Sequence, residues 1–152
     1  MEMGEDKMNK IKRWLFGLIG LAGLLDILGI ILLITAGTFA VMTIPSIILY
    51  VLLTMAAVNI GFVAVKGDVY KDILYYVGLK HLGTTKRIIY GLIGVAGLIA
   101  VLYLVTNWTG VIQTSILGIT GYVLSMVAAI NWGIISATGK EDQDGLYYLK
   151  LR

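Results

Sequence analysis

The chain has no cysteine, which excludes every kind of chemistry that depends on a thiol. Disulfides, thiol nucleophiles, iron–sulfur ligation and zinc–thiolate sites are all ruled out by this absence. Histidine occurs once, as His81 in a polar stretch beside lysines, and it has no neighbours of the type that a metal site requires. The sequence therefore predicts neither a bound metal nor a cofactor.

Charged residues and proline are also scarce. Only 14% of the 152 residues are charged, against about 25% in a typical soluble domain, and Pro45 is the single proline. By contrast, 59% of the residues are hydrophobic and the mean hydropathy is +0.90. Such a chain cannot bury its apolar surface alone, so we expect the lipid bilayer to surround most of it. The formal charge of +3 is too small to indicate a nucleic-acid partner.

Two pairs of similar segments indicate a tandem duplication. Residues 12–24 and 86–98 each begin with Lys-Arg, pass an aromatic residue and then carry glycine at every third position of an apolar run. The offset between them is 74 positions (86 − 12). Residues 50–61 and 122–133 share Tyr-Val-Leu and Asn-x-Gly at an offset of 72 (122 − 50). We therefore expect one integral membrane domain with two repeats, at about residues 10–82 and 84–152.

Four apolar runs are long enough for transmembrane helices, because a helix rises about 1.5 Å per residue and the hydrocarbon core is about 30 Å thick. They cover about residues 14–35, 44–65, 88–105 and 114–137. A signal peptide is the alternative for the first run, but the run is too long and has a twin in mid-chain. Residues 69–82 and 144–151 have the spacing of short amphipathic interfacial helices. The predicted fold is an all-α polytopic membrane protein of four transmembrane helices in two hairpin repeats of parallel topology, related by a pseudo-twofold axis along the membrane normal.

The distribution of basic residues predicts the orientation. All twelve Lys and Arg residues lie in the N-terminal tail, the middle connection or the C-terminal tail, which share one side if there are four spans. By the positive-inside rule both termini are then cytoplasmic, in a multi-pass protein of the cell membrane. Aromatic residues at this side, among them Trp14 and Tyr90, are expected in the interfacial belt.

Each predicted span carries a stripe of small residues, the feature that lets transmembrane helices approach closely. The stripes consist of Gly17, Gly20 and Gly23 in the first span, Ala57 and Gly61 in the second, Gly91, Gly94 and Gly97 in the third, and Ser125, Ala129 and Gly133 in the fourth. Contacts within the chain are the first interpretation, and contacts between copies in a homo-oligomer are the alternative.

Asp26 is the only acidic or basic residue inside a predicted span. It follows Trp14 by twelve positions, or about 18 Å of helix, which places it near the bilayer midplane. A carboxylate at that depth must be protonated, paired or in contact with water. Thr54 and Ser125 lie at similar depth as hydrogen-bond partners. Two interpretations stay open: a structural hydrogen bond, or an ion or proton site formed by these three residues.

Other polar positions carry weaker signals. Asn59 and Asn131 occupy equivalent places nearer the cytoplasmic side, and we expect them to face each other and bond between helices. The Asn-Trp-Thr segment at residues 107–109 fits the glycosylation pattern, but its closeness to the membrane argues for chance.

Several of these segments resemble a known family. Asn-Ile-Gly at 59–61, Gly-Asp-Val at 67–69, Lys-Arg-Ile-Ile-Tyr at 86–90 and Gly-Val-Ala-Gly-Leu at 94–98 are similar to the motifs of the YuzA-like family of small prokaryotic membrane proteins. The family unit has two spans, and the first of them carries the motif Asn-Trp-Gly. Residues 131–133 have this motif in full, whereas residues 59–61 have isoleucine in place of the tryptophan. The resemblance implies a tandem-duplicated four-span form. It implies no activity, because none is established for the family.

Function is predicted only by class. We expect a structural or interaction protein of the membrane, whose tyrosine-rich segments serve a cytoplasmic protein partner. The alternative is a small ion or proton channel or transporter that acts through Asp26 as a homo-oligomer, since four helices packed about 8–10 Å apart leave no aqueous path between them. An enzyme is not expected, because no nucleophile–base pair, metal cluster or phosphate-binding loop can be assembled.

Overall fold

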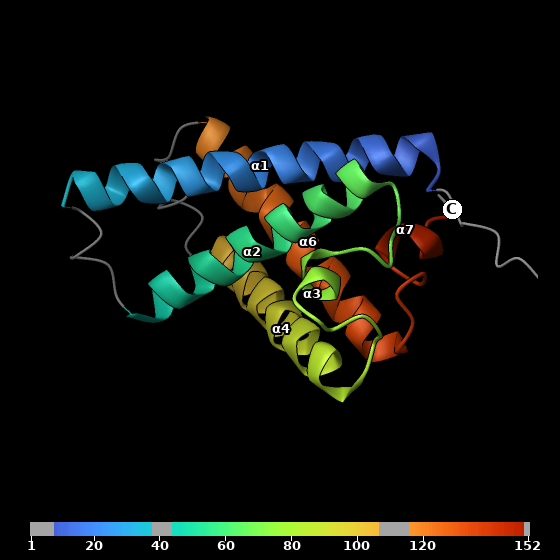
Figure 1. The fold of residues 1–152 in the computed structure, drawn as a ribbon. Helices are drawn as coiled ribbons and strands as arrows, with labels where there is room; N and C mark the ends of the chain where they lie inside the picture. The colour runs from blue at the N-terminus through green and yellow to red at the C-terminus, as the bar shows by residue number, and fades with distance from the viewer. Residues whose placement is uncertain (1–7, 38–43, 107–115, 151–152) are drawn as a thin grey trace, which may run out of the picture.

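The computed structural model describes residues 8–37, 44–106 and 116–150 and contains four long helices (Figure 1). The helices are α1 (Lys10–Thr35), α2 (Ile44–Lys66), α4 (Thr84–Thr106) and α6 (Ile116–Thr138). Each is long and apolar enough to cross a membrane. The chain is therefore an all-α, multi-pass membrane protein, as the sequence predicts. The residues around 107–109 lie outside the described part.

Local sequence explains where the long helices begin and end. Asn9 caps α1, since its Oδ1 accepts a hydrogen bond from Ile11 N at 2.9 Å. Pro45 lies in the first turn of α2, where its missing N–H is not needed. Gly67 and Gly139 follow α2 and α6 with φ of +69° and +73°. This left-handed backbone favours glycine and ends both helices in the same way.

The helices of each hairpin touch through glycine backbones. A Cβ built on Gly61 would lie 2.5 Å from the Cα of Gly20, and one built on Gly133 would lie 2.8 Å from the Cα of Gly94. These distances are too short for any side chain. Because the two contacts are 74 and 72 positions apart, α1 packs on α2 as α4 packs on α6.

A second contact follows one turn along each hairpin. A Cβ on Gly23 would lie 2.9 Å from the Cβ of Ala57, and a Cβ on Gly97 would lie 3.0 Å from that of Ala129. Gly91 faces the Ser136 side chain.

Gly17 departs from the predicted stripe. Nothing in the described part of the chain lies within 4 Å of a Cβ built there, so Gly17 makes no close contact within the chain.

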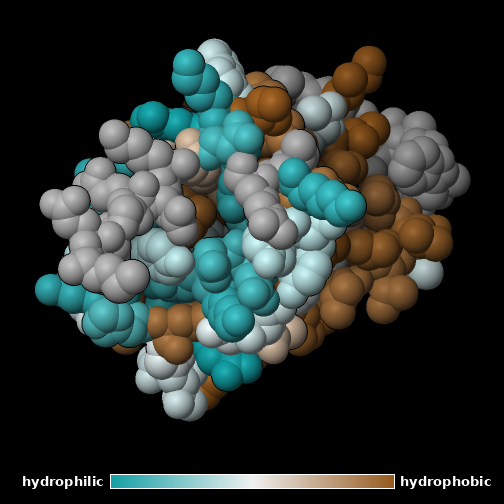
Figure 2. All heavy atoms as spheres, turned by 90° about the vertical axis from the view of Figure 1, so that its right-hand side faces the viewer, coloured by the Kyte–Doolittle hydropathy of each residue, from teal (hydrophilic) through white to brown (hydrophobic). Residues whose placement is uncertain are grey.

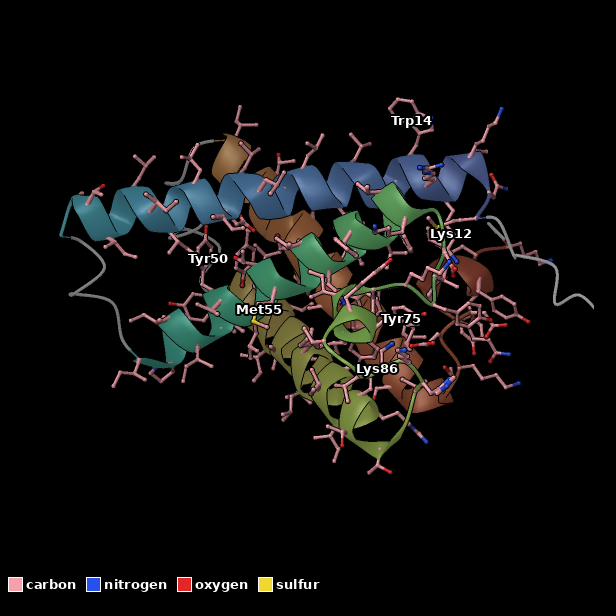
Figure 3. All side chains as sticks on the ribbon, in the orientation of Figure 1. Lys12, Trp14, Tyr50, Met55, Tyr75 and Lys86 are labelled. Atoms are coloured by element: carbon pink, nitrogen blue, oxygen red, sulfur yellow. The ribbon has the colours of Figure 1, made fainter. Side chains whose placement is uncertain are left out.

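The two hairpins meet along α2 and α6, which form the centre of the bundle, while α1 also contacts α6 and α2 contacts α4. Trp132 of α6 joins them, because its ring stacks on Tyr90 at 4.4 Å between centroids and its Nε1 donates to the carbonyl oxygen of Ala56. Tyr90 is completely buried. The expectation that Tyr90 lies in the interfacial belt is therefore wrong, whereas Trp14 is 75% exposed and points away from the bundle (Figure 3).

The predicted interfacial helices are shorter than expected. They are single turns, α3 (Ile73–Tyr76) and α7 (Gly145–Tyr148). Each turn is capped by an aspartate: Asp72 Oδ1 accepts from Tyr75 N at 2.8 Å and Asp144 Oδ1 from Tyr147 N at 2.9 Å. Because glycine with positive φ follows at Gly78, the first turn is not extended into a longer helix.

Candidate functional site

Asp26 lies in the middle of α1, and its carboxylate links three helices. Its Oδ2 accepts a hydrogen bond from Ser125 Oγ of α6 at 2.5 Å. Its Oδ1 lies 3.5 Å from the hydroxyl of Tyr50, which projects from α2 toward α1 (Figure 3). A Cβ built on Gly121 of α6 would lie 3.0 Å from Oδ1, so glycine leaves room for the carboxylate. Asp26 is 7% exposed, and hydroxyl groups engage both of its oxygens.

The equivalent place between α4 and α2 has no acidic residue. Ala100 corresponds to Asp26 at the offset of 74, and Leu53 corresponds to Ser125 at the offset of 72; both are buried. Tyr122, which corresponds to Tyr50, donates to the backbone carbonyl of Ala100 at 2.9 Å. The fold thus accepts an apolar pair between α4 and α2 where an acid and a hydroxyl lie between α1 and α6.

Thr54 does not join Asp26. Its Oγ1 donates to the carbonyl oxygen of Tyr50 in its own helix at 2.9 Å. Of the two hydroxyl residues expected beside Asp26, the structure brings only Ser125 to the carboxylate. Tyr50, which sequence reasoning missed, is the third member, and its position one helical turn before Thr54 was the available signal.

The two asparagines also differ from expectation. Asn59 Oδ1 accepts from Ile73 N at 2.8 Å, and Asn131 Oδ1 accepts from Gly145 N at 2.7 Å. Each therefore binds the first residue of the short helix in its own hairpin. The asparagines thus bond between helices, as expected, but their oxygens bind the short helices and do not connect the two asparagines, because unpaired N–H groups at the start of α3 and α7 are the nearer donors.

Buried ion pairs join the two hairpins reciprocally. Lys12 at the start of α1 lies 2.6 Å from Asp144 Oδ2, and Lys86 at the start of α4 lies 3.1 Å from Asp72 Oδ1. In each pair the lysine comes from one hairpin and the aspartate from the other. Lys86 also binds Glu141. All five side chains are buried, and Lys12 and Lys86 are labelled in Figure 3.

Glu141 makes this cluster unequal. Its equivalent in the first hairpin is Val69, so Lys86 has two carboxylates and Lys12 has one. Burial raises the pKa of Glu141, and the hydrogen bond and charge of Lys86 oppose this effect only in part. Protonation of Glu141 would leave the positive charge of Lys86 paired with the single negative charge of Asp72.

Sequence reasoning missed these ion pairs because it assigned Lys12, Lys86, Asp72 and Asp144 to solvated segments. One signal was available. The two lysines repeat at 74 positions and the two aspartates at 72, as do the glycines that pack. Charges that repeat with the packing residues are candidates for structural contacts, whereas solvated charges have no such constraint.

Chemically, these groups bond to one another rather than surround a ligand. In the described residues, no group of three or more His, Asp or Glu side chains could hold a metal ion. Comparison of the chain with protein-family models, curated proteins and solved structures found no match. The resemblance to the YuzA-like family stays a prediction.

Proposed function

We propose that this chain is a structural or interaction protein of the cell membrane without enzymatic activity. The observation that carries this proposal is the place of Asp26: its carboxylate is buried and engaged by Ser125 and Tyr50. A carboxyl group that binds and releases an ion needs an exchange path and free coordination. Here it connects α1 with α2 and α6, which is a structural role.

The competing function is an ion or proton channel or transporter, in which a homo-oligomer acts through Asp26. It is favoured by one fact, that a carboxyl group lies within a span at all. A flux assay distinguishes the two. Wild type and Asp26→Asn are reconstituted into liposomes, and proton and sodium flux are measured together with thermal unfolding in detergent.

We expect neither protein to give flux above empty liposomes. We expect the two to unfold at similar temperatures, because asparagine keeps a hydrogen-bonding side chain of the same shape. Wild-type flux that Asp26→Asn abolishes without a change in stability would defeat the proposal and establish transport. Equal flux from both would show conduction that does not depend on Asp26, and would also contradict the proposal.

The proposed orientation places both termini in the cytoplasm. It is supported by the charges of the described residues, since every Lys and Arg lies at the end of the bundle that holds the start of α1 and the end of α6. Because the chain has no cysteine, single cysteines report topology directly. In intact cells, Gly83→Cys and Asp142→Cys should resist an impermeant thiol reagent and Thr109→Cys should react. The reverse pattern would overturn the orientation.

The proposed partners are the bilayer, a second copy of the chain and a cytoplasmic protein. The tyrosine pairs of the short helices α3 and α7 favour the cytoplasmic protein partner. Tyr75 and Tyr76 contact edge to face, as do Tyr147 and Tyr148, and Tyr76 and Tyr148 are exposed at the polar end. Exposed tyrosines of this kind are suited to a protein surface as well as to lipid headgroups.

A further inference from the structure

Two apolar grooves occupy equivalent places on the bundle. The α2/α4 groove lies under α3 and has a volume of about 320 Å³. The α6/α1 groove lies under α7 and has a volume of about 470 Å³. Each is bordered by the second span of one hairpin and the first span of the other.

Eight residues of one lining correspond to eight of the other, whereas Ile27 and Ile30 of α1 line only the α2/α4 groove and Ile60 of α2 lines only the α6/α1 groove. The α2/α4 groove is lined by Met55, Val58 and Asn59 of α2 and by Ile89, Tyr90 and Ile93 of α4. The α6/α1 groove is lined at the matching offsets by Val127, Ile130 and Asn131 of α6 and by Leu15, Phe16 and Ile19 of α1. Recurrence of the same hollow in both halves shows that it belongs to the architecture of the hairpin pair.

The polar end of each groove is closed by groups that already have partners. Ile73 and Leu74 cover one groove, and Gly145 and Leu146 cover the other. The asparagine amides hold these turns in place, and the buried lysine–aspartate pairs tie them to α4 and α1. The rest of the wall is mainly hydrocarbon, and the hydroxyl groups of Thr54 and Tyr90 are the polar exceptions in the α2/α4 groove. Water therefore has few partners inside.

The bilayer determines what can fill such a hollow. An apolar cavity of about 150 Å³ has room for a molecule of the size of benzene, and both grooves are larger than this. An empty hollow would forfeit dispersion contacts along its whole wall. Because the grooves lie along helices that span the membrane, hydrocarbon chains of lipids are the apolar matter that reaches them.

The charges at one end of the bundle indicate which lipid headgroup would be bound there. At the end of the bundle that bears α3 and α7, the described residues include ten Lys and Arg against five Asp and Glu. Figure 2 faces this end and shows hydrophilic side chains gathered over it, with apolar side chains to one side. Leu149, which lines the α6/α1 groove, is followed directly by Lys150. An excess of cations beside an apolar groove is complementary to an anionic phospholipid.

We propose that each groove binds one hydrocarbon chain of an anionic phospholipid, with the headgroup at the cationic end of the bundle. The lipid fills the space between the two hairpins beneath α3 or α7. This inference does not depend on the proposed function, because it concerns the sides of the bundle and not Asp26.

The test uses the full chain, purified in detergent, with phosphatidylglycerol or phosphatidylcholine added, and counts retained lipid by native mass spectrometry. Met55→Trp fills the α2/α4 groove and Val127→Trp fills the other; both side chains are about half exposed at present. Leu102→Trp, on the exposed face of α4 outside both linings, is the matched control.

We expect wild type and Leu102→Trp to retain up to two phosphatidylglycerol molecules, and each groove variant to retain one fewer. Phosphatidylcholine should be retained less. Equal retention by the groove variants and the control, or no retention by wild type, would overturn the site. Equal retention of the two lipids would overturn the choice of an anionic headgroup.

A milder variant covers the case in which tryptophan prevents folding. Met55→Cys, labelled with a fluorophore, is titrated with phosphatidylglycerol brominated in its chains, and Leu102→Cys is treated in the same way. Quenching at position 55 should saturate near one lipid per protein, while quenching at position 102 should rise without saturating. Identical, unsaturated titrations at both positions would contradict the proposal.

Discussion

Lys12 Nζ lies 2.6 Å from Asp144 Oδ2, and this pair joins the first helix of one hairpin to the last turn of the other. Lys86 and Asp72 form the reverse connection at 3.1 Å. Each lysine also lies over an aromatic ring one turn further along its helix, Phe16 at 5.5 Å and Tyr90 at 5.6 Å. The hairpins are thus joined twice by the same device.

Loss of one aspartate should cost more in one hairpin than in the other. Asp144→Asn removes the carboxylate that pairs with Lys12, whereas Asp72→Asn leaves Lys86 with Glu141. Removing one partner of a buried pair destabilises by about 3–5 kcal/mol. We expect Asp144→Asn to reach this range and Asp72→Asn to fall below it. Thermal unfolding in detergent compares them, and equal losses would show that Glu141 does not replace Asp72.

Glu141 should make stability depend on pH. Its folded pKa is raised by burial above its ordinary value of 4.5. The stability that it contributes is therefore complete below that ordinary value and is lost as the pH rises through the folded pKa. We expect the unfolding temperature of wild type to fall over that range relative to that of Glu141→Gln, in which the group does not titrate.

The charges of Lys86, Asp72 and His81 all act on Glu141. The comparison with Glu141→Gln separates the titration of Glu141 from the pH effects of the rest of the chain. A difference between the two proteins that grows in favour of wild type as the pH rises would mean that the attraction of Lys86 outweighs burial.

The glycine stripes give a prediction with a control inside the same helix. Gly20→Leu and Gly94→Leu must each separate two backbones in contact, and overpacking of this kind costs about 1–3 kcal/mol or more. A Cβ at position 17 would meet no atom of the described residues within 4 Å, so Gly17→Leu should cost little. Unfolding temperatures in detergent should fall together for the first two and stay near wild type for the third. A large loss at Gly17 would indicate a contact between copies of the chain.

The sequence was sufficient to predict the spans because hydropathy and length decide them. The helices extend the predicted runs mainly at their polar starts, where Lys10, Lys12, Thr84 and Lys86 form the first turns. Apolar periodicity cannot detect such turns, since their residues are polar. The glycine contacts followed from spacing, but Gly17 shows that spacing alone does not say which glycines meet the neighbouring helix.

The polar contacts could be predicted only in part. Depth along the helix placed Ser125 beside Asp26, but the same measure also selected Thr54, which bonds to its own backbone. Depth fixes one coordinate of a side chain and leaves its rotation about the helix axis open. The bonding partners of the asparagine amides depend on where the following loop brings the backbone N–H groups of Ile73 and Gly145. The sequence pattern within a helix does not contain that information.

The pair of Asp26 and Ser125 can be exchanged for the apolar pair Ala100 and Leu53, which holds the equivalent positions of α4 and α2. Asp26→Ala alone leaves Ser125 without its carboxylate and removes buried volume, while Ser125→Leu alone leaves Asp26 without its closest donor. An unsatisfied buried polar group costs about 1–3 kcal/mol, so each single variant should be less stable than wild type. The double variant copies Ala100 and Leu53, which are both buried, and Tyr50 can then donate to the backbone as Tyr122 does.

We therefore expect the double variant Asp26→Ala/Ser125→Leu to recover most of the stability that each single variant loses, which thermal unfolding in detergent would measure as a coupling of about 1–3 kcal/mol. Additive losses would mean that the backbones of the two hairpins differ at this depth. The carboxylate would then determine how α1 packs on α6. Recovery of wild-type stability would instead show that the charge is dispensable for folding. In that case the double variant also tests transport. If wild type gives flux and the double variant does not, the loss is due to the missing carboxyl group and not to a destabilised bundle.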